Sequence, residues 1–107
     1  VARRYSAGLQ DIVEVPVVAP ECTSVWAQYS VLTDQRSRLQ QRLQDAGVPT
    51  AVYYPLPLHL QPAFQPLGLQ AGAFSVCEQV SARIMSLPMH PYMKAEDQEY
   101  IVRHLGR

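Results

Sequence analysis

Hydrophobic residues recur at helical spacing in four segments of this chain. The first, residues 1–9, predicts a short helix that ends near Gly8. The second follows Thr33 and Asp34, either of which can cap a helix, and Gly47 suits the C′ position that closes it. Two further sets of apolar residues mark the remaining helices: Val76, Val80 and Ile84, then Ile101, Val102 and Leu105.

Alternation of apolar and polar residues predicts short strands between these helices. From Ser24 to Leu32, Tyr29 and Val31 fall on one side and Trp26 falls on the other. The alternation in residues 48–54 places neighbouring side chains on opposite faces of a second strand, so only one member of its tyrosine pair can serve the core.

A third short strand is predicted from Ser86 to Met89, where Pro91 prevents further extension. Residues 11–18 suit a connection or an edge strand because Pro16 interrupts them. The order of elements predicts an α+β fold in which a small, mostly antiparallel sheet has helices packed on one face. A chain of 107 residues fits a single domain and buries about 65% of the surface that its unfolded form exposes.

The charge pattern argues against nucleic acid or an anionic membrane as a partner. Nine basic and nine acidic residues cancel, and neither sign forms a run. No apolar stretch approaches the 18 or so residues of a spanning helix, and the start of the chain lacks the apolar core of a signal peptide. We therefore expect a piece of a cytoplasmic protein.

The cysteines and histidines show no metal-binding pattern. Cys22 and Cys77 lie far apart without a CxxC motif, so reduced, buried thiols are expected. His59, His90 and His104 form neither an HxxxH nor an HExxH motif, and no metal site is predicted. His90, which precedes Pro91, suits a structural hydrogen bond at a strand end.

A proline-stiffened turn carries the most distinctive group of polar side chains. Pro55 and Pro57 fix the backbone around Tyr53, Tyr54 and His59, so these two phenols and one imidazole are presented on a rigid segment. From the residues alone, packing of the tyrosines in a core competes with a ligand-binding role. His59 is equally compatible with an idle surface loop and with a functional site.

The order of five segments resembles a known family over nearly the whole chain. These segments are Ala2–Tyr5, Ser24–Val31, Ala46–Thr50, Tyr54–Phe64 and Ser81–Tyr92, followed by a closing helix with an acidic start. The chain resembles the C-terminal small domain of the pyridoxal-phosphate sugar aminotransferases of the DegT/DnrJ/EryC1/StrS family. The resemblance implies the small domain of a fold-type I aminotransferase, with residues 1–9 ending a helix from a large domain and residues 10–107 forming the small domain.

The resemblance also implies a function for the parent protein. Family members place an amino group on nucleotide-linked keto-sugars, using pyridoxal 5'-phosphate bound by the large domain. The segments Ser86–Pro91 and Ala27–Tyr29 look most like the branch that acts on UDP-2-acetamido-3-oxo-hexuluronates for bacterial surface polysaccharide such as O-antigen. The implied partners are the chain's own large N-terminal domain, the nucleotide sugar, glutamate as amino donor and, in the full-length form, a second copy in a homodimer.

This chain lacks a candidate for the catalytic lysine of such an enzyme. A pyridoxal-phosphate transaminase needs a lysine that forms a Schiff base with the cofactor. Lys94 is the only lysine and stands at the start of the last helix, where exposure is the usual fate of this residue. We therefore assign no catalytic or cofactor-binding residue here and expect the isolated chain to be inactive.

The resemblance assigns substrate binding to Tyr53, Tyr54 and His59, which match the outer wall of the family's substrate pocket. Many relatives carry His-Tyr where this chain has Tyr53-Tyr54. A phenol with a pKa near 10 donates a hydrogen bond but does not act as a base at neutral pH. Two alternatives stay open: a sugar dehydratase of the same fold, with histidine in place of the lysine, and a free-standing, non-catalytic interaction module.

Overall fold

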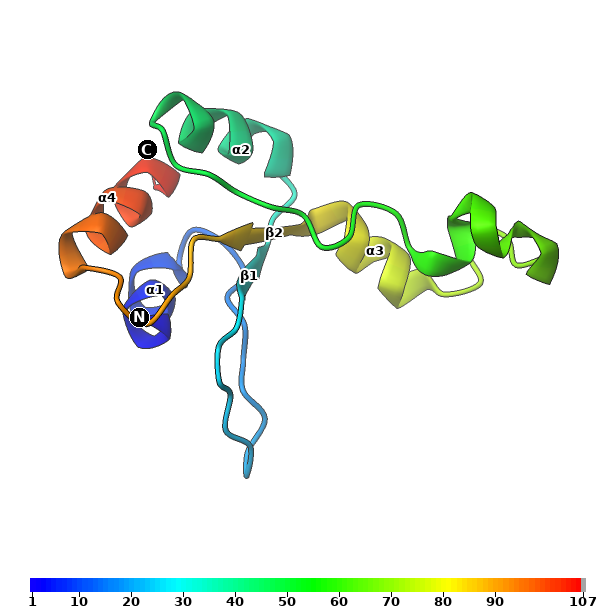
Figure 1. The fold of residues 1–107 in the computed structure, drawn as a ribbon, viewed down its shortest axis with the longest axis horizontal. Helices are drawn as coiled ribbons and strands as arrows, with labels where there is room; N and C mark the ends of the chain where they lie inside the picture. The colour runs from blue at the N-terminus through cyan, green and yellow to red at the C-terminus, as the bar shows by residue number, and fades with distance from the viewer. Residues whose placement is uncertain (107) are drawn as a thin grey trace.

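The computed structural model describes residues 1–106, which form four α-helices, two 3₁₀ helices and one pair of strands. Figure 1 shows their arrangement. In chain order the elements are α1 (Ala2–Leu9), β1 (Tyr29–Leu32), α2 (Arg36–Asp45), η1 (Leu58–Leu60), η2 (Pro62–Leu67), α3 (Ser75–Arg83), β2 (Ile84–Leu87) and α4 (Ala95–Leu105).

The two strands pair antiparallel, and their register places fully buried side chains on one face of the sheet and partly buried ones mainly on the other. Tyr29 lies opposite Leu87 and Val31 lies opposite Met85, and all four side chains are buried. Single bridges widen the sheet at both edges: Glu14 pairs with Leu32 of β1, and Ala51 pairs with Ser86 of β2. The period-two pattern of the sequence therefore identified the inward side chains of β1.

Three helices cover the buried face of the sheet. All three contribute side chains to one hydrophobic cluster with the inward residues of β1 and β2: Ala2, Tyr5 and Leu9 from α1, Leu39 and Leu43 from α2, and Ile101 and Leu105 from α4. The predicted α+β architecture, with an antiparallel sheet and helices packed on one face, is confirmed.

A stack of aromatic rings joins α1 to the sheet. The ring centroids of Tyr5 and Tyr29 are 5.0 Å apart, and Trp26 lies 5.6 Å from Tyr29. The Tyr5 hydroxyl donates to the carbonyl of Pro88 at 2.9 Å, and the Tyr29 hydroxyl bonds Ser6 at 2.8 Å. Burial raises the pKa of both phenols, so both hydroxyls stay protonated over the physiological range.

The C-terminal end of α2 follows the sequence signal, whereas the predicted cap at its start is wrong: the N-cap is Gln35 instead of Thr33 or Asp34, and no side chain caps the helix. Gly47 has a left-handed φ of +72° just beyond α2. Its N–H donates to the carbonyl of Gln44 at 2.9 Å, and the N–H of Val48 donates to that of Leu43 at 2.8 Å. These two bonds make a Schellman motif, which requires the positive φ that glycine adopts without steric cost.

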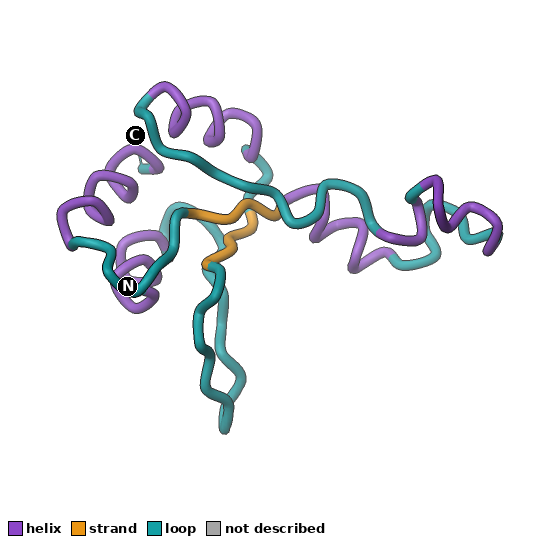
Figure 2. Tube along the Cα trace, in the orientation of Figure 1, coloured by secondary structure: helices purple, strands orange, loops and turns teal. Residues whose placement is uncertain are grey.

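Two segments project from this core. One is the hairpin loop, residues 15–28, and the other is the arm, residues 53–83, which contains η1, η2 and α3 (Figure 1). Figure 2 shows that the hairpin loop has no regular secondary structure. The radius of gyration is 15.5 Å, whereas a compact chain of this length has about 13 Å, because both projections lie outside the core.

The structure corrects the predictions for two strands. The strand expected from Ser24 begins only at Tyr29, because Trp26 adopts a left-handed φ of +51°. This break turns Trp26 toward the ring of Tyr29 and leaves Val25 94% exposed. Residues 48–54 contribute a single bridge at Ala51 instead of a strand.

Two further predictions about side chains on or near the arm are wrong. Val76 is 74% exposed and Ile84 belongs to β2, so these residues do not mark a core-facing stripe of α3. Cys22 and Cys77 are free, as expected, but both are exposed because they lie on the hairpin loop and the arm. Within residues 1–106, no helix is long and apolar enough to cross a membrane.

Candidate functional site

Tyr53 and Tyr54 lie where the arm leaves the core. Their ring centroids are 5.8 Å apart in an edge-to-face arrangement, and the peptide bond between them is cis. Tyr53 is 45% exposed and Tyr54 is 69% exposed. The prediction that the two rings point to opposite faces and that one serves the core is therefore wrong, because no strand forms here to impose the alternation.

A groove of about 350 Å³ opens beside Tyr53. It lies where the chain before the arm runs next to β2, held by two backbone hydrogen bonds between Ala51 and Ser86 of 3.1 and 2.8 Å. Its lining combines hydroxyl and amide groups with apolar side chains: Ala27, Gln28, Pro49, Thr50, Ala51, Tyr53, Ser86, Leu87, Pro88 and Met89. Such a mixture of polar and apolar groups is typical of ligand-binding grooves.

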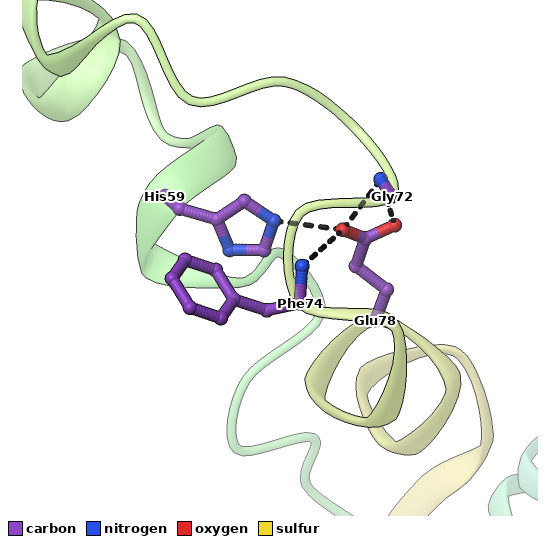
Figure 3. Close-up of polar contacts among 4 residues, drawn as sticks. All are labelled: His59, Gly72, Phe74 and Glu78. Atoms are coloured by element: carbon purple, nitrogen blue, oxygen red, sulfur yellow. Dashed lines mark hydrogen bonds and ion pairs between the residues drawn. The ribbon is translucent and has the colours of Figure 1, made fainter.

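His59 lies farther along the chain, in η1, and does not line this groove. Its Nε2 is 2.8 Å from Oε1 of Glu78, and its ring packs edge-on against Phe74 with centroids 4.9 Å apart. Figure 3 shows the imidazole beside both residues, which follow it in the second half of the arm. With only 7% of its surface exposed, His59 is a buried, paired residue and not an idle surface histidine.

Glu78 accepts hydrogen bonds from more than the imidazole. Its two carboxylate oxygens lie 2.8 and 2.9 Å from the backbone nitrogen of Gly72, and Oε1 lies 3.4 Å from that of Phe74 (Figure 3). The hydrogen bond from His59, followed by that from Gly72, holds the pKa of Glu78 below its ordinary value. The carboxylate is therefore ionised at neutral pH and acts only as an acceptor.

Sequence reasoning missed Glu78, although the sequence contains a signal for it. Glu78 is the only aspartate, glutamate, lysine or arginine between Asp45 and Arg83. A single charge in so long an uncharged segment needs a local partner, and the only histidine in that segment is His59. His90, the other histidine considered for a hydrogen bond, is exposed.

The described residues do not fit a covalently held pyridoxal phosphate. Lys94 is the only lysine in the sequence, is exposed and precedes α4 as its N-cap, without a side-chain capping bond. It lines neither the groove beside Tyr53 nor the grooves between α2 and α4 and between α1 and α4. Residues 1–106 also contain no cluster of three histidine, cysteine, aspartate or glutamate residues that could hold a metal ion.

Comparison with known proteins gives one consistent result. The model of the DegT/DnrJ/EryC1/StrS aminotransferase family matches residues 1–106. The chain is 40% identical over 94 residues to UDP-2-acetamido-2-deoxy-3-oxo-D-glucuronate aminotransferase of Pseudomonas aeruginosa, a match that covers 87% of this chain and 25% of that protein.

Solved structures agree in fold. A DegT/DnrJ/EryC1/StrS aminotransferase from Brucella abortus superposes with a TM-score of 0.90 at 42% identity, over 98% of this chain and 28% of that one. NtdA from Bacillus subtilis, solved with bound cofactor PMP, gives a TM-score of 0.78 at 27% identity, over 98% of this chain and 26% of that one. The chain thus spans less than a third of the length of these relatives, and it belongs to the DegT/DnrJ/EryC1/StrS aminotransferase family.

Proposed function

We propose that residues 10–107 form the C-terminal small domain of a pyridoxal-phosphate-dependent aminotransferase that aminates a nucleotide-linked keto-sugar, and that residues 1–9 end a helix from its large domain. The family match over residues 1–106 supports this proposal. The cofactor, when bound, supplies the electron sink that allows an amino group to be transferred. Its lysine anchor belongs to polypeptide outside this chain, since Lys94 does not fit that role.

For the substrate we propose UDP-2-acetamido-3-oxo-hexuluronate, used for a surface polysaccharide. Support comes from the relative in Pseudomonas aeruginosa, whose name specifies amination of a UDP-linked 2-acetamido-3-oxo sugar acid. Glutamate as the amino donor, a homodimeric full-length enzyme and a cytoplasmic location stay predictions.

The exposure of Tyr53 in the lining of a groove, together with the exposed ring of Tyr54 that packs against it, is the observation that supports a substrate-binding role most directly. Their hydroxyls have no hydrogen-bond partner among the described residues, in contrast to the buried hydroxyls of Tyr5 and Tyr29. A free phenol at a groove mouth donates a hydrogen bond to a sugar hydroxyl. His59 completes the proposed set from the arm, where its ring is held by Glu78.

The surfaces of the arm and the hairpin loop support a large domain as the partner. Between Asp45 and Arg83 the sequence has one charged residue, and between Glu14 and Asp34 it has only Glu21. The same segments expose large apolar side chains, such as Val25 on the hairpin loop and Leu67 on the arm. Depletion of charge together with exposed apolar groups is characteristic of interface cores.

The test is to express the full-length protein and record the visible absorbance of its bound cofactor. We expect glutamate to remove this absorbance band and the UDP-linked keto-sugar to restore it, with an amino sugar as the product. A product that has lost water or oxygen without gaining nitrogen would indicate the dehydratase alternative. A full-length gene product without any cofactor-binding domain would indicate a free-standing interaction module.

A further inference from the structure

The arm of this chain has almost no hydrophobic core of its own. Among residues 53–74 only Pro57 and His59 are buried, and η2 contains no buried residue. Its apolar side chains, including Leu58 and Leu67, face outward. Apolar burial, which fixes most protein segments, therefore contributes little to holding the arm in its shape.

A single hydrogen bond joins the two limbs of the arm. The outgoing limb comprises residues 53–67, and the returning limb comprises residues 72–83. Within the described chain, all other hydrogen bonds of these limbs stay inside one limb, lead to the tip at residues 68–71 or lead back to the core, and only Nε2 of His59 and Oε1 of Glu78 connect the limbs. The imidazole also packs edge-on against the ring of Phe74 in the returning limb (Figure 3).

Glu78 also fixes the chemical form of the imidazole. An ionised carboxylate accepts but does not donate, so Nε2 of His59 must carry the proton of the 2.8 Å bond. In the neutral ring, Nδ1 is then the unprotonated nitrogen and offers a lone pair. The N–H of Gly72, bonded to both carboxylate oxygens, fixes the carboxylate in turn.

We propose that Glu78 is a positioning residue that holds the two limbs of the arm together and sets the orientation and tautomer of His59 for substrate binding. The part concerning substrate rests on the proposed function above; the part concerning the arm does not. No other charged residue of the segment 46–82 competes for either group, since Glu78 is the only one. Sequence comparison assigns no role to Glu78, whereas the geometry gives it four hydrogen-bond contacts.

The structural part is tested by hydrogen–deuterium exchange on the full-length protein with the variants Glu78→Ala and Glu78→Gln. Glu78→Ala should raise amide exchange about tenfold or more in peptides covering residues 57–61 and 70–75. Glu78→Gln keeps an acceptor oxygen for Gly72 and should show a smaller rise. Glu99→Gln removes an exposed carboxylate on α4 and serves as the matched control, with wild-type exchange in both peptides. Wild-type exchange in both Glu78 variants would overturn the proposal.

The functional part is tested by steady-state kinetics on the same proteins. Glu78→Ala should raise KM for the nucleotide keto-sugar about 10- to 100-fold, while the reaction of the cofactor with glutamate keeps its rate, and Glu78→Gln should recover part of the loss. An unchanged KM in Glu78→Ala would overturn the positioning role. If the full-length protein aminates no keto-sugar, the proposed function fails, whereas the exchange experiment still decides whether Glu78 holds the arm.

Discussion

The tyrosines of this chain show how burial divides one residue type between two uses. Tyr5 and Tyr29 are fully buried, and each hydroxyl has a partner within hydrogen-bond distance. A buried hydroxyl without a partner would cost free energy, so these bonds belong to the fold. Tyr53 and Tyr54 are exposed and their hydroxyls are unpaired within residues 1–106, which leaves both available to a ligand.

Replacing Tyr53 by phenylalanine tests this availability. The Tyr53→Phe variant keeps the ring and removes the donor, and one neutral hydrogen bond contributes about 1 kcal/mol, so KM for the keto-sugar should rise about fivefold. The full-length protein is assayed by steady-state kinetics. Tyr92→Phe is the control, because Tyr92 is also highly exposed but does not line the groove. Equal KM values in wild type and Tyr53→Phe would argue against a sugar contact.

The His59–Glu78 pair predicts a measurable titration. The pKa of Glu78 should lie below its ordinary value of 4.5, and His59→Ala should raise it, since the imidazole is the largest cause of the shift. A depressed pKa means that the bond stabilises the arm above pH 4.5 and that this stabilisation disappears as the pH falls through the lower, folded-state value. Carbon-13 NMR of labelled glutamate measures the midpoint, and His90→Ala, which alters an exposed histidine, should leave it unchanged.

At the scale of elements, the sequence predicted helices better than strands. Gly47 and the acidic start of α4 mark helix ends through local backbone chemistry, and both helices form as expected. Helix α1 also ends near Gly8, although Gly8 itself lies inside the helix. Strand limits depend on partners that lie far away in the sequence. The left-handed backbone at Trp26 and the single bridge at Ala51 therefore could not be derived from alternation alone.

The contact between α1 and α4 depends on Gly8, which has no side chain. A Cβ atom built on Gly8 would lie 2.9 Å from Cγ1 of Val102, whose branched side chain has little freedom to move. Gly8→Ala improves helix propensity by about 0.5–1 kcal/mol, but overpacking costs about 1–3 kcal/mol. We expect a net destabilisation of about 1 kcal/mol, measured by denaturant unfolding of the full-length protein with exchange at the amides of α1.

A second variant separates overpacking from other effects of Gly8→Ala. In the Gly8→Ala/Val102→Ala double variant the clash is relieved, so Gly8→Ala should become neutral or stabilising in the Val102→Ala background. The same loss of stability in both backgrounds would show that Val102 is not the cause.

At the scale of the whole molecule, the two segments that project from the core are also the segments with few charged residues. The helices around the core carry most of the charged residues, whereas the hairpin loop and the arm carry few and extend the molecule to 48 × 38 × 24 Å. The resemblance to the family predicted this division only indirectly, by implying a missing partner. Neither composition nor periodicity indicates that a segment will leave the core, because an exposed apolar residue looks like a core residue in sequence.

The arm surface makes a prediction about the full-length protein. Leu67 is 67% exposed in this chain, and packing against a large domain should protect it from hydroxyl-radical labelling, together with Leu58 and Val76, which are also exposed on the arm. Leu67→Asp places a charge in that interface, where desolvation without a partner is costly, so labelling of Leu58 and Val76 should rise at least about tenfold. Tyr92→Asp, at an exposed position outside both projections, should leave the labelling unchanged. Strong labelling of the wild-type arm would mean that no domain covers it, and the charge-poor surface would then need another partner.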